Sequence, residues 1–517
     1  MYTLGDIPRK SALFHGDRTA VVFEDVRLTH RELNSRVNRL AGALAAWGIE
    51  KGVRIAILGE NSDRYLTAYF AAAKLGACVV PLNFRLSDNE LKHILEDSEA
   101  GLLFAGEGYE QRAATIAKQV PSLGPVIALE KAASGMVFLE DLIRDRPDRE
   151  PDAYVHEDDL AVLMYTGGTT GQPKGVMLSH RNLMTAVTAM AVIAGVRPTD
   201  STCFVLPLFH VSIWPVFLLL LAGGKVVINR KMDLGEILRL IQDEQCTHMN
   251  LVPTVYTWLM EYPQADQYDL SSLQMLSYAG SPFPPENLSR CIRRFGPLFA
   301  QGYGSTETAG GPVSFLSMED HHVSGPNSRL LASAGKPSVC SEVRILDEDG
   351  TPLPAGQIGE VAVKGRHVMM GYWKNPELTE KTLRDGWLHM GDMGLLDHDG
   401  YLFLLDRKAD MIVTGGENVY PQETENVLYQ HEAVLECAVV SAPDDRWGER
   451  VQAVVVLKNE AKASEEELIA HCKAKLAGYK CPKSIVFQET LPKTPIGKIL
   501  RKELKQEFWK GHNRSIG

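Results

Sequence analysis

Hydrophobic and polar positions in the first 150 residues alternate between a helical and a strand pattern. Within 28–48, apolar residues recur every three or four positions, which predicts an amphipathic helix: Leu33, Val37, Leu40 and Leu44. Thr29 followed by Glu32 predicts a capping box at its start. Short apolar runs at 53–58 and 78–81 predict strands on either side of a second helix at 65–75. This succession predicts α/β layers with mostly parallel strands.

The pattern changes between 335 and 401. Short strands are predicted at 343–346, 359–364 and 401–405, separated by Asp-Gly, Pro-x-Gly and glycine-rich turns. We therefore expect a small β-rich subdomain, with Asp392 on a loop between two glycines. The longest apolar run, 211–224, is interrupted by Ser212 and Pro215 and is shorter than the roughly 20 residues that span a bilayer. No transmembrane segment is expected, and peripheral membrane contact is left open.

Length, charge and cysteine content narrow the class of protein. A chain of 517 residues is too long for one compact core, so two or more domains are expected. The net charge of -11 argues against general nucleic-acid binding, although a local cradle can still concentrate positive potential. The eight cysteines include no Cys-x-x-Cys pair, and the first ten residues lack the apolar core of a signal peptide. We expect reduced thiols and a cytoplasmic protein.

A glycine- and threonine-rich segment at 165–176 is the first candidate for chemistry. It reads Tyr-Thr-Gly-Gly-Thr-Thr-Gly-Gln-Pro-Lys-Gly-Val and follows an apolar run. Glycines let backbone N–H groups approach a ligand, and threonine hydroxyls with a lysine ammonium complete a cradle for a multiply charged anion. Lys174 is followed by Gly175 rather than Ser or Thr, so this is not the phosphate loop of most nucleotide triphosphatases. A polyphosphate is the predicted ligand.

The segment at 301–308, Gln-Gly-Tyr-Gly-Ser-Thr-Glu-Thr, carries complementary chemistry. Tyr303 offers an aromatic face for a purine, Thr306 a hydroxyl for phosphate, and Glu307 a carboxylate for a hard cation such as Mg²⁺. Alone, such a segment is compatible with a simple turn. Together with the cradle it predicts a nucleotide site.

These two segments, with 387–394, 406–425 and 492–502, resemble in order the motifs of the adenylate-forming superfamily, which includes acyl-CoA synthetases, aryl-CoA ligases, luciferases and peptide-synthetase adenylation domains. The resemblance covers nearly the whole chain. It implies an α/β fold with a large N-terminal domain (1–405) of two α/β sheet subdomains plus a β subdomain. A hinge (406–410) would connect it to a small, mobile α+β C-terminal lid domain (411–517).

The resemblance implies an ATP-dependent acyl-CoA ligase. Its carboxylic acid substrate would attack the α-phosphate of ATP to give acyl-AMP and pyrophosphate, and CoA would then take the acyl group. ATP, Mg²⁺ and CoA are therefore expected, and a homodimer is left open. A stand-alone adenylation enzyme that loads a carrier protein is the alternative, and a non-catalytic binding protein is a remote one. An ordinary P-loop ATPase or a dehydrogenase is excluded because their glycine motifs are missing.

Site residues carry over position by position. The resemblance implies catalytic roles for Lys498, which would bridge the carboxylate and α-phosphate, and for Thr306, Glu307 as Mg²⁺ ligand, and His210. The expected ATP- or AMP-binding residues are Thr166, Gly167, Thr169, Thr170, Lys174, Gly280, Ser281, Tyr303, Gly304, Asp392 and Arg407. Expected CoA-binding residues are Gly415, Gly416, Trp447 and Lys480. Ala409 stands at the hinge position, where the family usually has a charged residue. Rotation there would withdraw Lys498 and bring in Gly415.

The implied acyl pocket is apolar. Its expected lining is His210, Val211, Ile213, Trp214, Tyr278, Ala279, Gly302 and Ala309. No basic partner for a second carboxylate occurs in this set, so a hydrophobic monocarboxylic acid, fatty or aryl, is expected. Trp214 would shorten the pocket, whereas the small residues at 309–311 would leave room for a longer chain. The sequence leaves the choice open.

Overall fold

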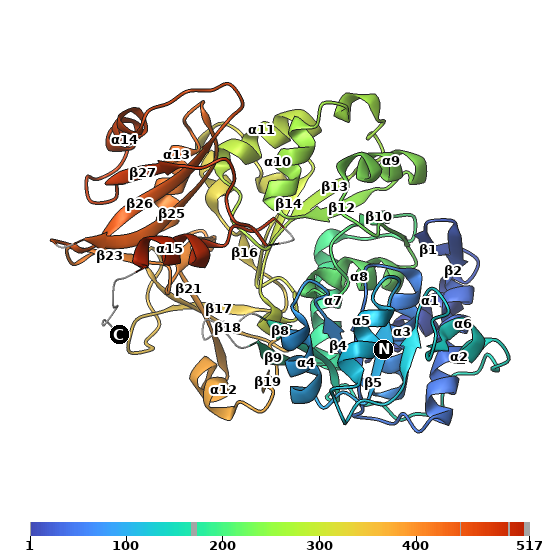
Figure 1. The fold of residues 1–517 in the computed structure, drawn as a ribbon. Coiled ribbons are helices and arrows are strands. Elements are labelled where there is room, and N and C mark those ends of the chain that lie inside the picture. Colours follow the sequence, from blue (N-terminus) through green and yellow to red (C-terminus); the bar gives the residue numbers. More distant parts are fainter. Residues whose placement is uncertain (1, 167–172, 445, 495–496, 511–517) are drawn as a thin grey trace.

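Two large, mostly parallel sheets and two smaller sheets form the protein (Figure 1). The computed structural model describes residues 2–166, 173–444, 446–494 and 497–510. The N-terminal two thirds contain both large sheets, and the C-terminal part sits against them as a separate layer at the upper left of Figure 1. No described helix is long and apolar enough to cross a membrane. All eight cysteines are free, and seven are buried.

The nine-stranded sheet has the order β16-β15-β14-β13-β12-β10-β11-β1-β2. Its central strands are parallel, and antiparallel pairs close both edges. The strands are β1 (Thr19–Phe23), β2 (Val26–Thr29), β10 (Ser201–Phe204), β11 (Lys225–Ile228), β12 (His248–Leu251), β13 (Met275–Tyr278), β14 (Phe299–Tyr303), β15 (Ser314–Leu316) and β16 (Lys336–Pro337).

The eight-stranded sheet has the order β19-β9-β8-β4-β3-β5-β6-β7 and is parallel from β8 to β7. Its strands are β3 (Arg54–Leu58), β4 (Cys78–Leu82), β5 (Leu102–Ala105), β6 (Val126–Ala128), β7 (Val137–Phe138), β8 (Leu160–Thr166), β9 (Lys174–Ser179) and β19 (Gly371–Tyr372). The predicted α/β layers with mostly parallel strands are confirmed.

Helices connect the strands of the two large sheets. They are α1 (Asp6–His15), α2 (His30–Ala46), α3 (Asp63–Leu75), α4 (Asp88–Asp97), α5 (Glu110–Ala117), α6 (Leu139–Ile143), α7 (His180–Ala194), α8 (Trp214–Ala222), α9 (Leu234–Glu244), α10 (Pro253–Glu261) and α11 (Pro285–Phe295). Short 3₁₀ turns are η1 (Val211–Ile213), η2 (Ala265–Gln267), η3 (Thr306–Thr308), η4 (Met318–Asp320) and η5 (Pro326–Ala332). The largest core cluster joins α2, α3 and α8 to strands of both sheets, so the two sheets share one hydrophobic core.

The third sheet is the predicted β-rich subdomain. It contains β17 (Glu342–Leu346), β18 (Gly359–Lys364), β20 (Leu383–Arg384), β21 (Trp387–Leu396) and β22 (Leu402–Arg407), with α12 (Pro376–Thr382) beside it. The expectation that Asp392 lies on a loop is wrong, because Asp392 is within β21. Gly391 adopts a positive φ of 70°, which lets the strand continue past the glycines. Pairing with β22 then extends the strand to ten residues.

The fourth sheet belongs to the C-terminal part. It contains β23 (Ile412–Thr414), β24 (Glu417–Val419), β25 (Val434–Asp444), β26 (Gly448–Leu457) and β27 (Ser484–Phe487), packed with α13 (Pro421–Leu428), α14 (Glu465–Lys473) and α15 (Arg501–Trp509). Two separate core clusters lie on the two faces of β25 and β26. This part therefore has its own α+β core.

The predicted capping box at the start of α2 is present. Glu32 N donates to Thr29 Oγ1 at 3.2 Å, and Thr29 N donates to Glu32 Oε2 at 2.8 Å. We expect Thr29→Ala to lower the free energy of unfolding by about 1 kcal/mol, because two N–H groups at the helix start depend on this reciprocal pair. The midpoint of denaturant-induced unfolding would measure the loss. Ser35→Ala, on the same helix without a capping role, is the control, and an equal loss in both variants would contradict the prediction.

Candidate active site

The site is built where neighbouring parallel strands of the nine-stranded sheet end. β10, β12, β13 and β14 are adjacent and point the same way. His210 follows β10, α10 follows β12, the segment 279–281 follows β13, and Tyr303 closes β14 just before η3. The carboxyl ends of parallel strands are the usual place for ligands in open α/β sheets. Predicted residues from three of these four segments therefore follow strands that end at one edge.

Asp392 contacts two other residues that are predicted to bind the nucleotide, Arg407 and Tyr303. Asp392 and Arg407 are cross-strand partners of β21 and β22, and Arg407 Nε lies 2.7 Å from Asp392 Oδ1. The Tyr303 hydroxyl donates to Asp392 Oδ2, a contact that the sequence did not predict. Burial raises the pKa of Asp392, although the guanidinium of Arg407 and the hydroxyl of Tyr303 oppose the rise. The Asp392 carboxylate is therefore buried, and its contacts with Arg407 and Tyr303 fix its orientation.

Lys174 and Glu307 form a second cluster. Lys174 Nζ lies 3.2 Å from Glu307 Oε1, and the Tyr372 hydroxyl bridges them at 2.8 Å from Lys174 Nζ and 2.9 Å from Glu307 Oε1. The ammonium also lies 4.3 Å from the centre of the Tyr372 ring. Burial favours a raised pKa for Glu307, but the Lys174 charge and the Tyr372 hydroxyl outweigh it, so the pKa is lowered. Glu307 is therefore ionised at neutral pH.

The predicted phosphate cradle includes the ends of two paired strands. β8 and β9 are antiparallel, and Thr166 of β8 pairs with Lys174 of β9. Gly167, Thr169 and Thr170 fall outside the described residues. Thr166 Oγ1 is buried without a hydrogen-bond partner among the described residues, as is Ser305 Oγ beside Thr306. Buried hydroxyls are normally satisfied, so these two oxygens fit a bound polar group such as a phosphate.

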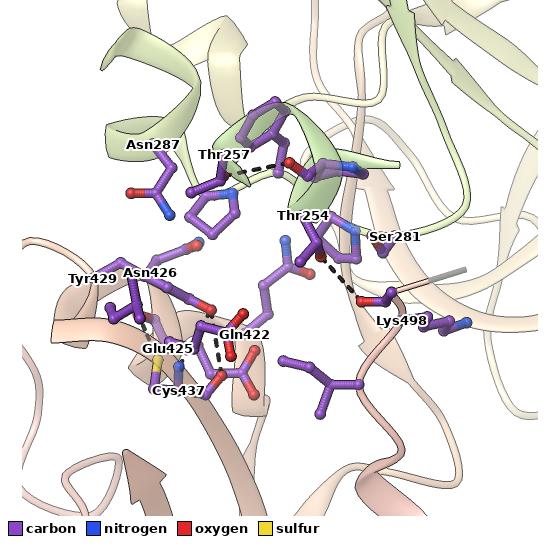
Figure 2. Close-up of a pocket in the computed structure, with 18 of the residues that line it drawn as sticks. Thr254, Thr257, Ser281, Asn287, Gln422, Glu425, Asn426, Tyr429, Cys437 and Lys498 are labelled. Carbon is purple, nitrogen blue, oxygen red and sulfur yellow. Dashed lines mark hydrogen bonds between the residues drawn. The ribbon is translucent and has the colours of Figure 1, made fainter. Parts of the chain in front are cut away.

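Glycines bring the backbone close together around this cradle. A Cβ at Gly304 would lie 2.3 Å from the carbonyl oxygen of Gly311, so no side chain fits there. Gly280 adopts a positive φ of 86° and is exposed at the turn after β13. The neighbouring Ser281 lines a cavity of about 110 Å³ between the two parts of the chain, shown in Figure 2.

Lys498 comes to this edge from the C-terminal part. The carbonyl of Gly497 accepts a hydrogen bond from Thr254 Oγ1 on α10 at 3.1 Å, and Figure 2 shows this contact at one end of the cavity. Surrounding protein atoms lower the pKa of Lys498, and the Arg407 charge adds to this while Asp392 opposes it. The residue itself is exposed to solvent. Its ammonium therefore lies within electrostatic range of the nucleotide residues.

The charge of the same lysine also acts on His210. Burial lowers the pKa of His210 to about 4, and the Lys498 charge contributes to the shift, so the imidazole is neutral at pH 7. His210 Nδ1 accepts from the backbone N–H of Ser212 at 3.2 Å. With Nδ1 an acceptor, this hydrogen bond assigns the proton to Nε2, which leaves an N–H donor for a ligand.

The predicted acyl-pocket residues divide into two groups. Val211, Ile213 and Ala309 are buried, and Trp214 and Ala279 are partly buried. A Cβ at Gly302 would meet no atom within 4 Å, so Gly302 borders open space. Tyr278 packs instead in the second core cluster, with its hydroxyl 3.1 Å from His321 Nε2. Its pocket role stays a prediction.

The idea that 309–311 leave room for a longer chain is wrong. A Cβ at Gly310 would lie 2.7 Å from the Val211 carbonyl oxygen, and one at Gly311 would lie 2.5 Å from Ala186 Cβ. Neighbouring atoms already fill the space that the absent side chains leave. These glycines allow close packing of η1 and α7 rather than enlarging a pocket.

The predicted CoA residues lie away from this edge. Gly415 and Gly416 are exposed in the turn between β23 and β24, and Gly415 N donates to the Trp447 carbonyl at 3.0 Å. Figure 1 shows β23 at the outer edge of the C-terminal part, far from β14. Lys480 Nζ pairs with Glu423 at 2.8 Å. Their CoA role stays a prediction, and it requires the two parts to move relative to each other.

The predicted hinge coincides with a change of sheet. β22 ends at Arg407 in the third sheet, and β23 begins at Ile412 in the fourth. Ala409 lies between them. Rotation at this position stays a prediction.

Sequence reasoning missed two residues that contact the site. Tyr372 lies on the short edge strand β19, which pairs with β9 beside Lys174, and Thr254 opens α10. The Gly-Tyr-Trp run at 371–373 could have been read as a short strand, but its partner is almost 200 residues away. A strand pairing over that distance in the sequence cannot be predicted from the local pattern of residues.

Comparisons with known proteins identify the family of this chain. The model of the AMP-binding enzyme family matches residues 9–373, and that of the AMP-binding enzyme C-terminal domain matches 423–498. The chain therefore belongs to the AMP-binding, adenylate-forming enzyme family.

Individual relatives extend over the full length. A feruloyl-CoA synthase from an Amycolatopsis species is 40% identical, covering 98% of this chain and 99% of the relative. The medium/long-chain-fatty-acid–CoA ligase FadD8 of Mycobacterium tuberculosis is 33% identical, covering 97% and 90%. The crystal structure of the anthranilate CoA ligase AuaEII with anthranoyl-AMP superposes with a TM-score of 0.90 at 29% identity, covering 98% and 97%. The expected class, an AMP-forming acid–CoA ligase that uses ATP and CoA, is confirmed, as is its fold.

We expect Tyr372→Phe to raise the KM for ATP about tenfold with a smaller effect on kcat. The hydroxyl orients both Lys174 and Glu307, and a lost hydrogen bond to charged groups costs about 1.5 kcal/mol. Steady-state kinetics with varied ATP would measure the change. Tyr165→Phe is the matched control, because its hydroxyl bonds to Asp97 on α4 rather than to the site. An unchanged KM for ATP in Tyr372→Phe would contradict the role.

Proposed function

We propose that this enzyme joins a hydrophobic monocarboxylic acid, with an aryl acid preferred, to CoA through an acyl-adenylate held between His210 and Asp392. The observation that carries the proposal is the position of the Lys498 segment: the Thr254–Gly497 hydrogen bond holds it at the strand edge where Tyr303 contacts the Asp392–Arg407 pair. The Lys498 ammonium would lie between the acyl pocket and the ribose site. A cation in that position is suited to a reaction that joins a carboxylate to a phosphate.

In the first step, a carboxylate oxygen of the acid attacks the α-phosphorus of ATP, and the bond from that phosphorus to the pyrophosphate oxygen breaks. Positioning and charge neutralisation dominate such phosphoryl chemistry. Lys498 would neutralise the carboxylate and the α-phosphate as they meet, and Thr306 would contact the α-phosphate. The products are acyl-AMP and pyrophosphate.

Asp392 would accept hydrogen bonds from the ribose hydroxyls, with Arg407 holding its carboxylate in place. Tyr303 would cover the adenine. Thr166, Lys174 and the cradle around them would hold the β- and γ-phosphates. The neutral His210, with its proton on Nε2, would donate to a carboxylate oxygen without adding charge.

Mg²⁺ fits the site through Glu307. No cluster of three or more metal-ligating side chains occurs among the described residues, which suits a cation that is shared with substrate phosphates and water. Glu307 would hold it from the protein side. When bound, the ion would neutralise negative charge on the phosphates.

In the second step, the CoA sulfur attacks the acyl carbon, and the bond from that carbon to the AMP oxygen breaks. Lys498 occupies the approach to this carbon, so the C-terminal part must turn about Ala409 first. Turning would bring Gly415, Gly416 and Trp447 toward the acyl-adenylate. Domain movement of this kind is a known way to separate two reactions at one site.

The apolar lining, without lysine or arginine among its predicted residues, supports a hydrophobic monocarboxylate. Filled space at Gly310 and Gly311 argues against a long chain. The 40% identity to a feruloyl-CoA synthase supports a preference for aryl acids. A pyrophosphate-release screen across aryl and fatty acids of varied length, with CoA or with an acyl carrier protein, would test the proposal. We expect the highest kcat/KM with aryl acids and CoA, and a preference for long fatty acids or for the carrier protein would contradict it.

We expect Lys498→Ala to slow adenylation at least about 100-fold, because one preorganised cation at the developing charge is lost. Synthetic acyl-AMP with CoA should still give the thioester at a rate close to that of the unchanged enzyme. Stopped assays of pyrophosphate and of acyl-CoA would separate the two steps. Lys510→Ala, at an exposed lysine beyond α15, is the control. Normal adenylation by Lys498→Ala would refute the assignment.

A further inference from the structure

Asp406 connects chain segments on the two sides of the predicted hinge. Its backbone is held in the third sheet, where it pairs with Met393 of β21. Its carboxylate contacts the C-terminal part: Oδ1 lies 3.2 Å from Arg501 Nη1, and Oδ2 accepts from Gln422 N at 3.1 Å. The Asp406 side chain is 2% exposed. A buried carboxylate therefore fastens the start of α13 and the start of α15 to the sheet that carries Asp392.

Arg501 is well fixed within the C-terminal part. Its Nε lies 3.2 Å from Glu425 Oε1, and that oxygen also accepts from Val439 N at 2.7 Å. Glu425, on α13, holds one side of the guanidinium, and Asp406 supplies the contact from across the hinge. Arg501 lies three residues after Lys498. The position of the Lys498 segment is thus linked to Asp406 through a short piece of chain.

A cavity lies beside this link. Its volume is about 110 Å³, it separates α10 and the 281–287 segment from α13 and β25, and Arg501 lies on its wall. Glu425 lies on the same wall (Figure 2). Beyond it, Thr254 bonds to Gly497, and the Lys493 ammonium lies 5.4 Å from a ring centre of Trp258. The Asp406–Arg501 pair is therefore a directed contact between the two parts beside this cavity.

We propose that Asp406 is a positioning residue for adenylation: through Arg501 and the start of α13 it holds the C-terminal part where Lys498 reaches the cleft. The inference rests on the proposed two-step reaction. Turning the C-terminal part about Ala409 carries Arg501 and Gln422 with it, while Asp406 stays in the third sheet. The carboxylate stabilises the adenylating orientation selectively, because its two partners leave it when that orientation is lost.

The test is Asp406→Asn, which removes the charge and keeps the shape. We expect single-turnover formation of acyl-AMP to slow by about tenfold, in the range of typical coupling between sites. Thioester formation from preformed acyl-AMP should be unchanged or faster, and the KM for ATP should change little. A residue with a merely structural role would lower both half-reactions together. Equal loss in both, or no loss in either, would overturn the proposal.

Asp397→Asn is the matched control. Asp397 follows β21 and pairs with Arg329 at 2.7 Å, with both partners before the hinge. It should leave the ratio of the two half-reactions unchanged. If Asp406→Asn fails to fold, Arg501→Lys weakens the same link while keeping its charge, and it should shift the ratio in the same direction.

A conformational measurement separates this inference from the proposed reaction. Spin labels at Lys118→Cys on the N-terminal part and Asn459→Cys on the C-terminal part, both exposed positions, would report the distance between the parts without turnover. Cys340→Ser would remove the one partly exposed native thiol. We expect Asp406→Asn to broaden or shift the distance distribution even for an enzyme inactive on the chosen acid. An unchanged distribution would refute the positioning role, whereas failure of all acids would count against the proposed substrates.

Discussion

The arrangement of the active site depends on the groups that offset the buried negative charge of Asp392. Removal of a charge from water is costly unless other groups replace the solvent. Here Arg407 binds one carboxylate oxygen and Tyr303 the other, and Lys498 approaches from beyond the hinge. Arg407 and Lys498 repel each other, and Asp392 offsets that repulsion. The negative charge of Asp392 thus stabilises both cations.

The interface between the two parts of the chain is suited to the proposed rotation. Its contacts include the Thr254–Gly497 hydrogen bond and the Asp406–Arg501 ion pair, with a cavity beside them. Separation of large packed apolar surfaces would be slow and costly. Hydrogen bonds and ion pairs that water can replace give an orientation that is defined and still reversible. The hydrophobic clusters of the C-terminal part lie inside it, so they are not disturbed by such movement.

The local pattern of hydrophobic and polar residues predicted helices and strands well where that pattern was regular. The capping box of Thr29 and Glu32, the strands at 54–58 and 78–82, and the β-rich third sheet all follow from spacing and turn residues. The motifs also predicted that Tyr303, Asp392, Arg407 and Lys498 would gather at one site. Prediction failed where a long-range partner decides the outcome. Asp392 is in a strand because β22 pairs beside it, and Gly310 and Gly311 are packed against η1 and α7.

Contacts between segments that are distant in the sequence could not be predicted either. Tyr372 reaches Lys174 through pairing of β19 with β9, and no local feature records that partner. Asp406 and Arg501 are 95 residues apart, and the charge of each is unremarkable in its own segment. Sequence motifs therefore predicted the groups that are expected to touch substrate. The contacts that orient those groups could be found only from the fold.

The proposed roles of Lys174 and Glu307 have a consequence for how the nucleotide enters. Without ligand, the Lys174 cation, proposed to bind the phosphates, and the Glu307 anion, proposed to bind Mg²⁺, neutralise each other. A nucleotide that arrived bare would take the lysine and leave an ionised glutamate facing its own negative oxygens. Arrival of the nucleotide together with its divalent ion replaces both halves of the pair at once. The resting site thus favours the metal complex over free ATP before any chemistry begins.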